Sequence, residues 1–134
     1  MIDDLRFAIC DLGHENFKMK EEIKNRTKNL AVEIIKFCDE LPEDTKYYVI
    51  SKQIIRSATS VGANYRAACR GKSKADFIAK LGIVEEEADE TLYWLELLLE
   101  LDSGLKKRVS PLYKEMNEIL SIVVASKKTA RRNL

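Results

Sequence analysis

The chain has few of the residues that form turns or cross-link a fold: glycine, proline and cysteine. Five glycines and two prolines in 134 residues are too few for a protein with many turns, and they favour a small number of long helices over a β-rich fold. Its three cysteines, Cys10, Cys38 and Cys69, are odd in number and widely spaced, which excludes a disulfide framework and a clustered metal site. We expect free thiols in a reducing compartment.

Long hydrophobic runs are also missing. Runs such as that from Leu97 to Leu99, which is flanked by Glu96 and Glu100, fall far short of the length that crosses a membrane. The segment from Met1 to Leu5 is acidic and lacks the apolar run of a signal peptide. From these two absences we expect a cytoplasmic protein without a membrane partner.

Residues that build catalytic sites are scarce. His14 is the single histidine, and we expect an exposed bystander, because one histidine cannot assemble a zinc site alone. The sequence has no Gly-x-Ser-x-Gly motif and no phosphate-binding glycine loop. A metal site made only of carboxylates on Glu87 and Glu90 is one alternative, but pairing of these acids with Arg56 is favoured. We therefore predict no enzyme, no catalytic residue, no metal and no cofactor.

The composition that is present is that of one globular domain, with 46% hydrophobic and 34% charged residues. Apolar residues recur at steps of three and four, the spacing of one buried helix face. This pattern predicts four helices, over about 17–40, 45–70, 73–102 and 110–126. Four amphipathic helices with short links predict an all-α fold, an antiparallel up-down-up-down four-helix bundle.

The ends of these helices carry recognisable signals. Ser73 followed by Asp76 resembles a capping box, and Ser110 with Pro111 predicts a helix that starts with proline in its first turn. Gly62 interrupts the second helix and indicates a kink or a close approach of backbones. We divide the chain into three parts: an N-terminal arm over 1–16, the bundle over 17–126 and a basic C-terminal tail over 127–134.

Charge alternates in sign along the chain. Residues 45–80 hold eight bases and one acid, whereas residues 81–102 hold eight acids and no base. Two basic clusters stand out. The turn between the second and third helices carries Arg66, Arg70, Lys72 and Lys74. The C-terminus carries Lys127, Lys128, Arg131 and Arg132. Such clusters bind phosphate backbones without reading sequence. Ordinary solubility charge is the alternative, and the sequence leaves both open.

Polar residues also follow one flank of the second helix. They are Gln53, Arg56, Ser57, Ser60 and Asn64, and all but Ser57 lie at steps of three and four along that flank. We expect a buried polar network that fixes helix register, or contacts to another subunit, in preference to a ligand site.

The same region carries a family resemblance. The segment SKQIIRSATSVGAN (51–64) is followed by Ser73, by Phe77-Ile78-x-Lys80-Leu81 and by EADETLYWL (87–95). Over about residues 18–125 the chain resembles the bacterial four-helix-bundle family encoded within intervening sequences of 23S ribosomal RNA genes. That family includes the accessory variability determinant of diversity-generating retroelements.

The resemblance implies a homopentameric ring and no known enzymatic activity. For the retroelement member it implies binding to nucleic acid and to a reverse transcriptase. The matching signature positions, which it implies are structural or inter-subunit, are Arg56, Ser60, Asn64, Glu87, Glu90 and Trp94. The chain departs from the family at Tyr65-Arg66, where its turn is more basic, and in its extra N-terminal arm.

Two hypotheses follow. The first is a non-catalytic oligomeric scaffold that binds RNA or DNA backbone through the two basic clusters. The second is a protein–protein interaction module that binds no nucleic acid. A ring needs apolar surface beyond the bundle core, and we expect residues off the main stripes to supply it: Val32, Phe37, Tyr48, Ile55 and Trp94.

Overall fold

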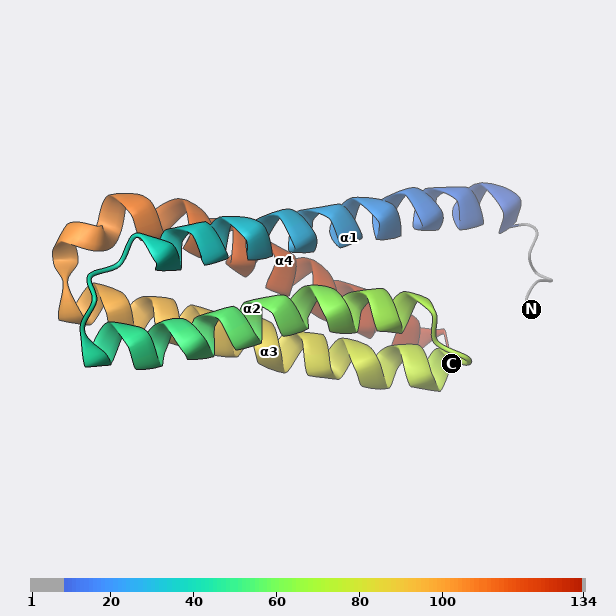
Figure 1. The fold of residues 1–134 in the computed structure, drawn as a ribbon. Helices are drawn as coiled ribbons and strands as arrows, with labels where there is room; N and C mark the ends of the chain where they lie inside the picture. The colour runs from blue at the N-terminus through green and yellow to red at the C-terminus, as the bar shows by residue number, and fades with distance from the viewer. Residues whose placement is uncertain (1–8, 134) are drawn as a thin grey trace.

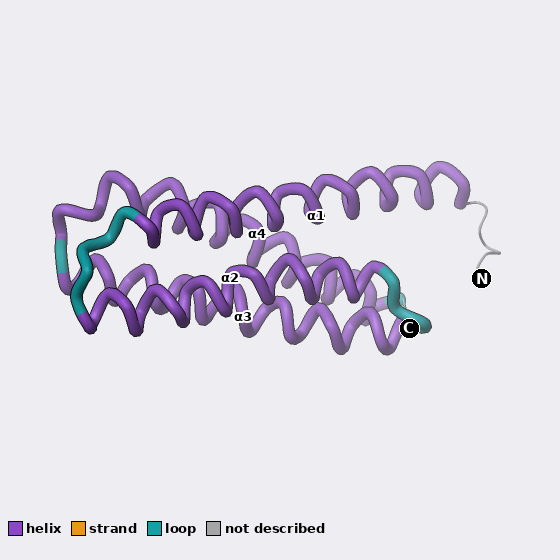
Figure 2. The backbone as a smooth tube through the Cα atoms, in the orientation of Figure 1, coloured by secondary structure: helices purple, strands orange, loops and turns teal. Residues whose placement is uncertain are grey.

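The computed structural model describes the backbone of residues 9–133 and the side chains of residues 16–133. Over this range the chain forms α1 (Ile9–Asp39), α2 (Thr45–Cys69), α3 (Lys74–Leu101) and α4 (Lys106–Arg132), with a 3-10 turn, η2 (Ser103–Leu105), before α4. Figure 2 shows helices and short loops in this part of the chain and no strand. The predicted all-α fold of four helices is therefore confirmed.

The helices surround a single core. Figure 1 shows the chain turning back at each connection, so that each helix runs beside the one before it. In the described range α1 packs against α2 and α4, and α3 packs against α2 and α4. Each helix therefore has two neighbours and buries one stripe toward the middle.

The core contains the predicted apolar stripes. Ile34, Val61, Leu95 and Ile119, one from each helix, are fully buried. Phe37 differs from expectation, because it is only 5% exposed and belongs to the core rather than to the outer surface. Three residues after Ile34, it returns to the same helix face, as α-helical geometry requires.

Local capping explains where two helices start. The Asp44 carboxylate accepts the Lys46 N–H at 3.4 Å at the start of α2. The Ser73 hydroxyl accepts the Asp76 N–H at 3.1 Å at the start of α3, as predicted. Both side chains satisfy amide hydrogens that have no partner inside the helix.

Two helices are longer than predicted. α1 begins at Ile9 rather than near Phe17, because one glycine in a long helix costs only about 1 kcal/mol relative to alanine and does not end it. α4 begins at Lys106, so Ser110 is not its N-cap and Pro111 lies inside the helix. Residues 127–132, within the predicted basic tail, continue α4.

Gly62 marks a close approach of helices. A Cβ atom at this position would lie 3.3 Å from Oγ1 of Thr27, a buried residue of α1. α2 continues unbroken through the glycine. Of the two predicted roles, the close approach is the one that the structure contains.

Candidate nucleic-acid interface

The two basic clusters lie at the same end of the molecule. Figure 1 shows the end of the described chain beside the turn between α2 and α3. The Lys74 ammonium donates to the Asn133 carbonyl at 3.3 Å, which joins the start of α3 to the end of α4. We call this region the basic end and define it by the seven exposed bases that it presents: Arg66, Arg70, Lys72, Lys74, Lys128, Arg131 and Arg132.

These seven side chains are available to an anion. Within residues 16–133 none of them forms an ion pair. Arg66 is in the last turn of α2 and Arg70 is its C-cap, four residues later, so the two side chains lie on the same side of this helix end. Unpaired exposed bases that lie together attract phosphate groups at low ionic strength.

Lys127 differs from the rest of its cluster. Its ammonium lies 2.6 Å from Oε1 of Glu85, a carboxylate oxygen of α3 that has no other partner in the described range. The Lys127 side chain is only 17% exposed. The structure therefore places Lys127 in the contact between α3 and α4, apart from the exposed bases.

Asp76 orders the turn of the basic end. Its carboxylate accepts from the Lys80 ammonium at 2.8 Å and from the Lys72 N–H at 3.2 Å. Both contacts lower the pKa of Asp76 below its ordinary value, and the hydrogen bond from Lys80 has the larger effect. The ionised acid fixes the turn and leaves the Lys72 side chain exposed.

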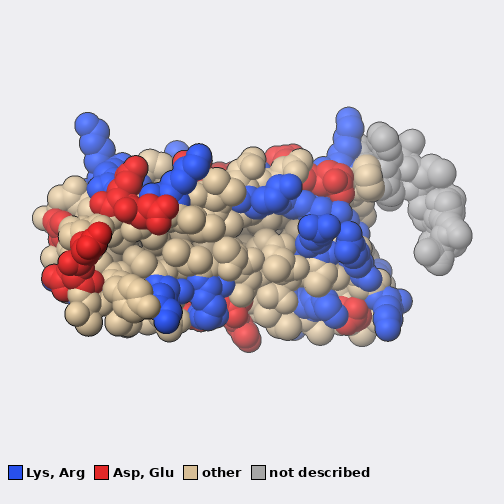
Figure 3. Space-filling view, viewed as in Figure 1, with Lys and Arg blue, Asp and Glu red and all other residues tan. Residues whose placement is uncertain are grey.

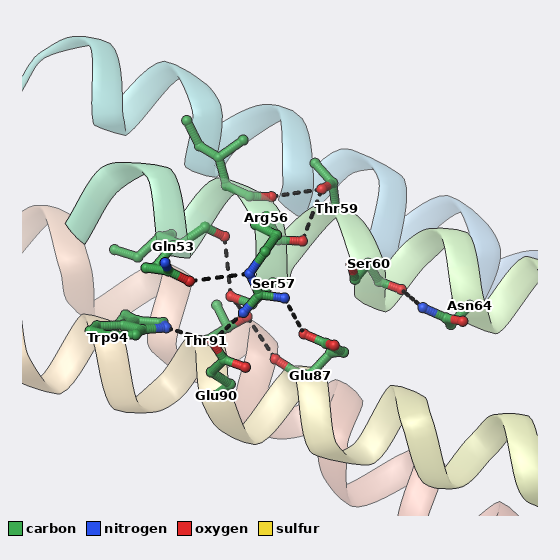
Figure 4. Close-up of polar contacts among 12 residues, drawn as sticks. Gln53, Arg56, Ser57, Thr59, Ser60, Asn64, Glu87, Glu90, Thr91 and Trp94 are labelled. Atoms are coloured by element: carbon green, nitrogen blue, oxygen red, sulfur yellow. Dashed lines mark hydrogen bonds and ion pairs between the residues drawn. The ribbon is translucent and has the colours of Figure 1, made fainter. Parts of the chain in front are cut away.

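A second polar group lies where α2 faces α3 (Figure 4). The Arg56 guanidinium pairs with Glu90 and, at 3.1 Å, with Glu87, which confirms the predicted pairing. Gln53 accepts from Arg56 at 3.1 Å, and the Trp94 indole donates to Glu90 at 2.9 Å. The Trp94 and Arg56 hydrogen bonds lower the pKa of Glu90.

The rest of the predicted polar flank does not join this network. The Asn64 amide donates to the Ser60 carbonyl at 2.9 Å, within α2. Figure 4 shows these two residues apart from Arg56 and its partners. Arg56 itself is about half exposed, so the network is a surface clamp between α2 and α3 rather than a buried network.

Two further polar contacts join helices: one involves Ser57 of the predicted polar flank, and the other was not predicted. The Thr91 hydroxyl lies 2.7 Å from the Ser57 hydroxyl, and both residues are fully buried between α2 and α3. Arg26 of α1 forms a two-pronged contact with Glu115 of α4, at 2.8 and 2.9 Å, and also pairs with Glu118. Nothing in the sequence indicated the second contact, because the helical register that brings Arg26 to Glu115 cannot be obtained from spacing alone.

The described range contains neither a cluster of metal ligands nor a helix that could cross a membrane. No group of three histidine, cysteine, aspartate or glutamate side chains is placed to hold a metal there. Among residues 9–133 no helix is apolar over a length that would cross a lipid bilayer. The side chains of Cys10 and His14 lie outside the described residues, whereas Cys38 and Cys69 are free thiols and Cys38 is buried.

Comparison with known proteins extends the resemblance. The family model described as 23S rRNA-intervening sequence protein matches residues 19–125. A solved structure is similar over 81% of this chain and 97% of its own, with 38% sequence identity and a TM-score of 0.75. It is a protein with unknown function from the S23 ribosomal protein family of Bacteroides thetaiotaomicron. Among curated proteins, no match is found.

Proposed function

The chain belongs to the 23S rRNA-intervening sequence protein family, and from this membership and the basic end we propose that it is a non-catalytic, oligomeric scaffold that binds the phosphate backbone of RNA or DNA. The scaffold is an antiparallel up-down-up-down four-helix bundle, and it acts in the cytoplasm. Where such a gene accompanies a reverse transcriptase, that enzyme is the expected protein partner.

One observation carries the proposal for nucleic acid. Two clusters that are far apart in the sequence meet at the basic end, where seven exposed bases have no ion pair in the described range. Their contact with phosphates releases counterions, which supplies affinity without base recognition. Some acids of α3 are paired with Arg56 and Lys127. Unpaired positive charge is therefore concentrated at the basic end, although the net charge of the chain is only +1.

Exposed apolar residues support the oligomer, which the family resemblance implies to be a pentamer. Tyr48 is 65% exposed and Val49 50% exposed on α2, and Tyr93 is 55% exposed on α3. Large apolar side chains gathered on a surface commonly mark contacts between proteins. The same residues favour the second candidate function, a protein–protein interaction module without nucleic-acid binding.

Binding of structured RNA and of duplex DNA across a salt series tests the proposal. We expect affinity to fall linearly on a log–log plot, with a slope of about −0.9 per phosphate contact on duplex DNA. A variant that carries Arg66→Glu, Arg70→Glu, Lys72→Glu and Lys74→Glu should lose this binding.

A matched control reverses four exposed lysines away from the basic end: Lys52, Lys106, Lys107 and Lys114. This control has the same net charge as the test variant, and it should bind nearly as the native protein does because its basic end is intact. Equal loss in both variants would mean that net charge alone attracts the nucleic acid. No binding of the native protein at low salt would contradict the proposal and favour the interaction module.

A further inference from the structure

A groove of about 480 Å³ runs between α1 and α2 and opens toward the basic end. It extends along α1 from Glu21 to Ala31 and along α2 from Thr59 to the C-cap, Arg70. Its lining includes the small residues Thr27, Ala31, Gly62 and Ala63, and Gly62 allows the two helices to approach closely there. Arg66 and Arg70 line the groove and also belong to the basic end, so the two surfaces are continuous.

Basic residues stand on both walls of this groove. Lys24 and Lys28 come from α1, and Arg66 and Arg70 come from the end of α2 and its C-cap. On each wall the two bases are four residues apart, or about 6 Å along the helix. Figure 3, in the orientation of Figure 1, shows lysine and arginine side chains gathered over α1 and α2 toward this end of the molecule.

One acid lines the groove, and it is already engaged. Glu21 accepts from the Lys24 ammonium at 2.7 Å, so this pair is close to neutral. Lys28, like Arg66 and Arg70, is exposed and forms no ion pair within residues 16–133. The groove therefore keeps an excess of positive charge beside its small lining residues.

The shape and lining of the groove select one kind of nucleic acid. The axes of packed helices lie only about 8–10 Å apart, so a whole double helix is too bulky to enter the groove between them and can contact only its rim. A single strand can enter such a groove. No aromatic side chain is among the lining residues, so bases have no stacking platform and the contacts fall on phosphates.

We propose that the α1–α2 groove holds the phosphates of a single-stranded segment of nucleic acid, whose strand continues onto the basic end. This inference rests on the proposed function, which it deepens by naming the strand state of the ligand and the contact residues. Lys28, Arg66 and Arg70 contact successive phosphates, and Asn25, exposed on the same wall, supplies an amide donor. Recognition is independent of base sequence.

The test compares a single-stranded oligouridylate with a paired RNA hairpin that has the same number of phosphates. Ala63→Glu places a carboxylate in the groove at an exposed position. Its matched control, Ala79→Glu, adds the same charge at an exposed position of α3 outside the groove. We expect Ala63→Glu to weaken single-strand binding roughly tenfold and to leave hairpin binding unchanged. Ala79→Glu should change neither.

A second variant reports the contact itself. Lys28→Ala should reduce the log–log salt slope on the single strand by about 0.7, the contribution of one phosphate contact. Circular dichroism verifies that each variant keeps its helices. Single-strand binding by both groove variants at the native level would overturn the groove, while loss in the Arg66, Arg70, Lys72 and Lys74 variant would leave the proposed function standing.

Two other outcomes also decide. Equal weakening of single-strand and hairpin binding by Ala63→Glu would overturn the selection for single strands. If the native protein binds neither RNA at low salt, the proposed function fails and the groove assignment fails with it.

Discussion

Two hydroxyls occupy a place in the core where apolar side chains would be expected. Ser57 and Thr91 are fully buried, and each also lies near a carbonyl of the preceding turn, Ile54 at 3.3 Å and Glu87 at 2.8 Å. Every polar atom of the pair therefore has a partner within reach. A satisfied pair of this kind fixes the register of α2 against α3.

Removal of either hydroxyl alone should destabilise the fold by more than half of what removal of both costs. We expect Ser57→Ala and Thr91→Val each to lower the free energy of unfolding by about 1–2 kcal/mol, because each leaves the other group short of a partner. The double variant should cost less than the sum of the two. Urea unfolding of all four proteins measures this coupling. Strict additivity would show that the two hydroxyls act independently.

Some single-residue contacts could be predicted and others could not. The pairing of Arg56 with Glu87 and Glu90 follows from a basic helix that is next to an acidic one in the chain. The contact of Arg26 with Glu115 joins residues 89 positions apart, and nothing in the spacing sets the register of α1 against α4. For the Ser57–Thr91 pair, Ser57 could be named as a candidate for a buried polar network. Its partner Thr91 could not, because a hydroxyl beside an apolar stripe is equally suited to core and surface.

At the scale of elements, helix existence followed from apolar periodicity, whereas helix ends did not. The starts of α2 and α3 depend on capping side chains that can be identified in the sequence, Asp44 and Ser73. The start of α4 was misplaced because Pro111 is tolerated inside the helix. Proline there leaves the Lys107 carbonyl without its helical donor, and the exposed position of both residues gives that carbonyl access to water.

Two glycines inside helices should respond differently to the same substitution. A Cβ at Gly82 of α3 would meet no atom within 4 Å, so Gly82→Ala should raise the free energy of unfolding by about 1 kcal/mol through helix propensity. Gly62→Ala should gain less or lose stability, because its Cβ would lie 3.3 Å from Thr27 Oγ1.

The Thr27→Ala background provides the control for this comparison. Without the Thr27 hydroxyl, Gly62→Ala should recover a gain similar to that of Gly82→Ala, whereas Gly82→Ala should be indifferent to residue 27. Thermal unfolding followed by circular dichroism gives the four differences. An equal gain at both glycines in the native background would disprove the close-approach role of Gly62.

At the scale of the whole molecule, several acids share a response to pH. Arg26 lowers the pKa of Glu115 through its hydrogen bonds, and the pKa values of Asp76 and Glu90 are lowered as well. A carboxyl whose folded pKa lies below its unfolded pKa stabilises the fold above the unfolded value, near 4.3 for Glu, and this contribution is lost as pH falls through the folded value.

We therefore expect stability to be nearly constant from neutral pH to about pH 5 and to fall below about pH 4.5. Glu115→Gln should lower the free energy of unfolding by about 1 kcal/mol at neutral pH, and this difference should shrink as the solution becomes more acidic. Glu86→Gln, at an exposed acid with no ion pair in the described range, is the control. Protein concentration is held fixed, since oligomers gain stability with concentration. A Glu115→Gln difference that does not change with pH would contradict the assignment.

The single tryptophan gives the molecule an internal optical probe. Trp94 donates its indole N–H to Glu90 and lies 5.0 Å from the ring of exposed Tyr93. Lys74 and Trp94 are about 30 Å apart along α3 at a rise of about 1.5 Å per residue. Assembly through the surface around Tyr93 should therefore shift the emission spectrum of this indole, whereas a ligand on the basic end should leave the spectrum unchanged. One fluorescence titration can thus separate self-association from nucleic-acid capture without any added label.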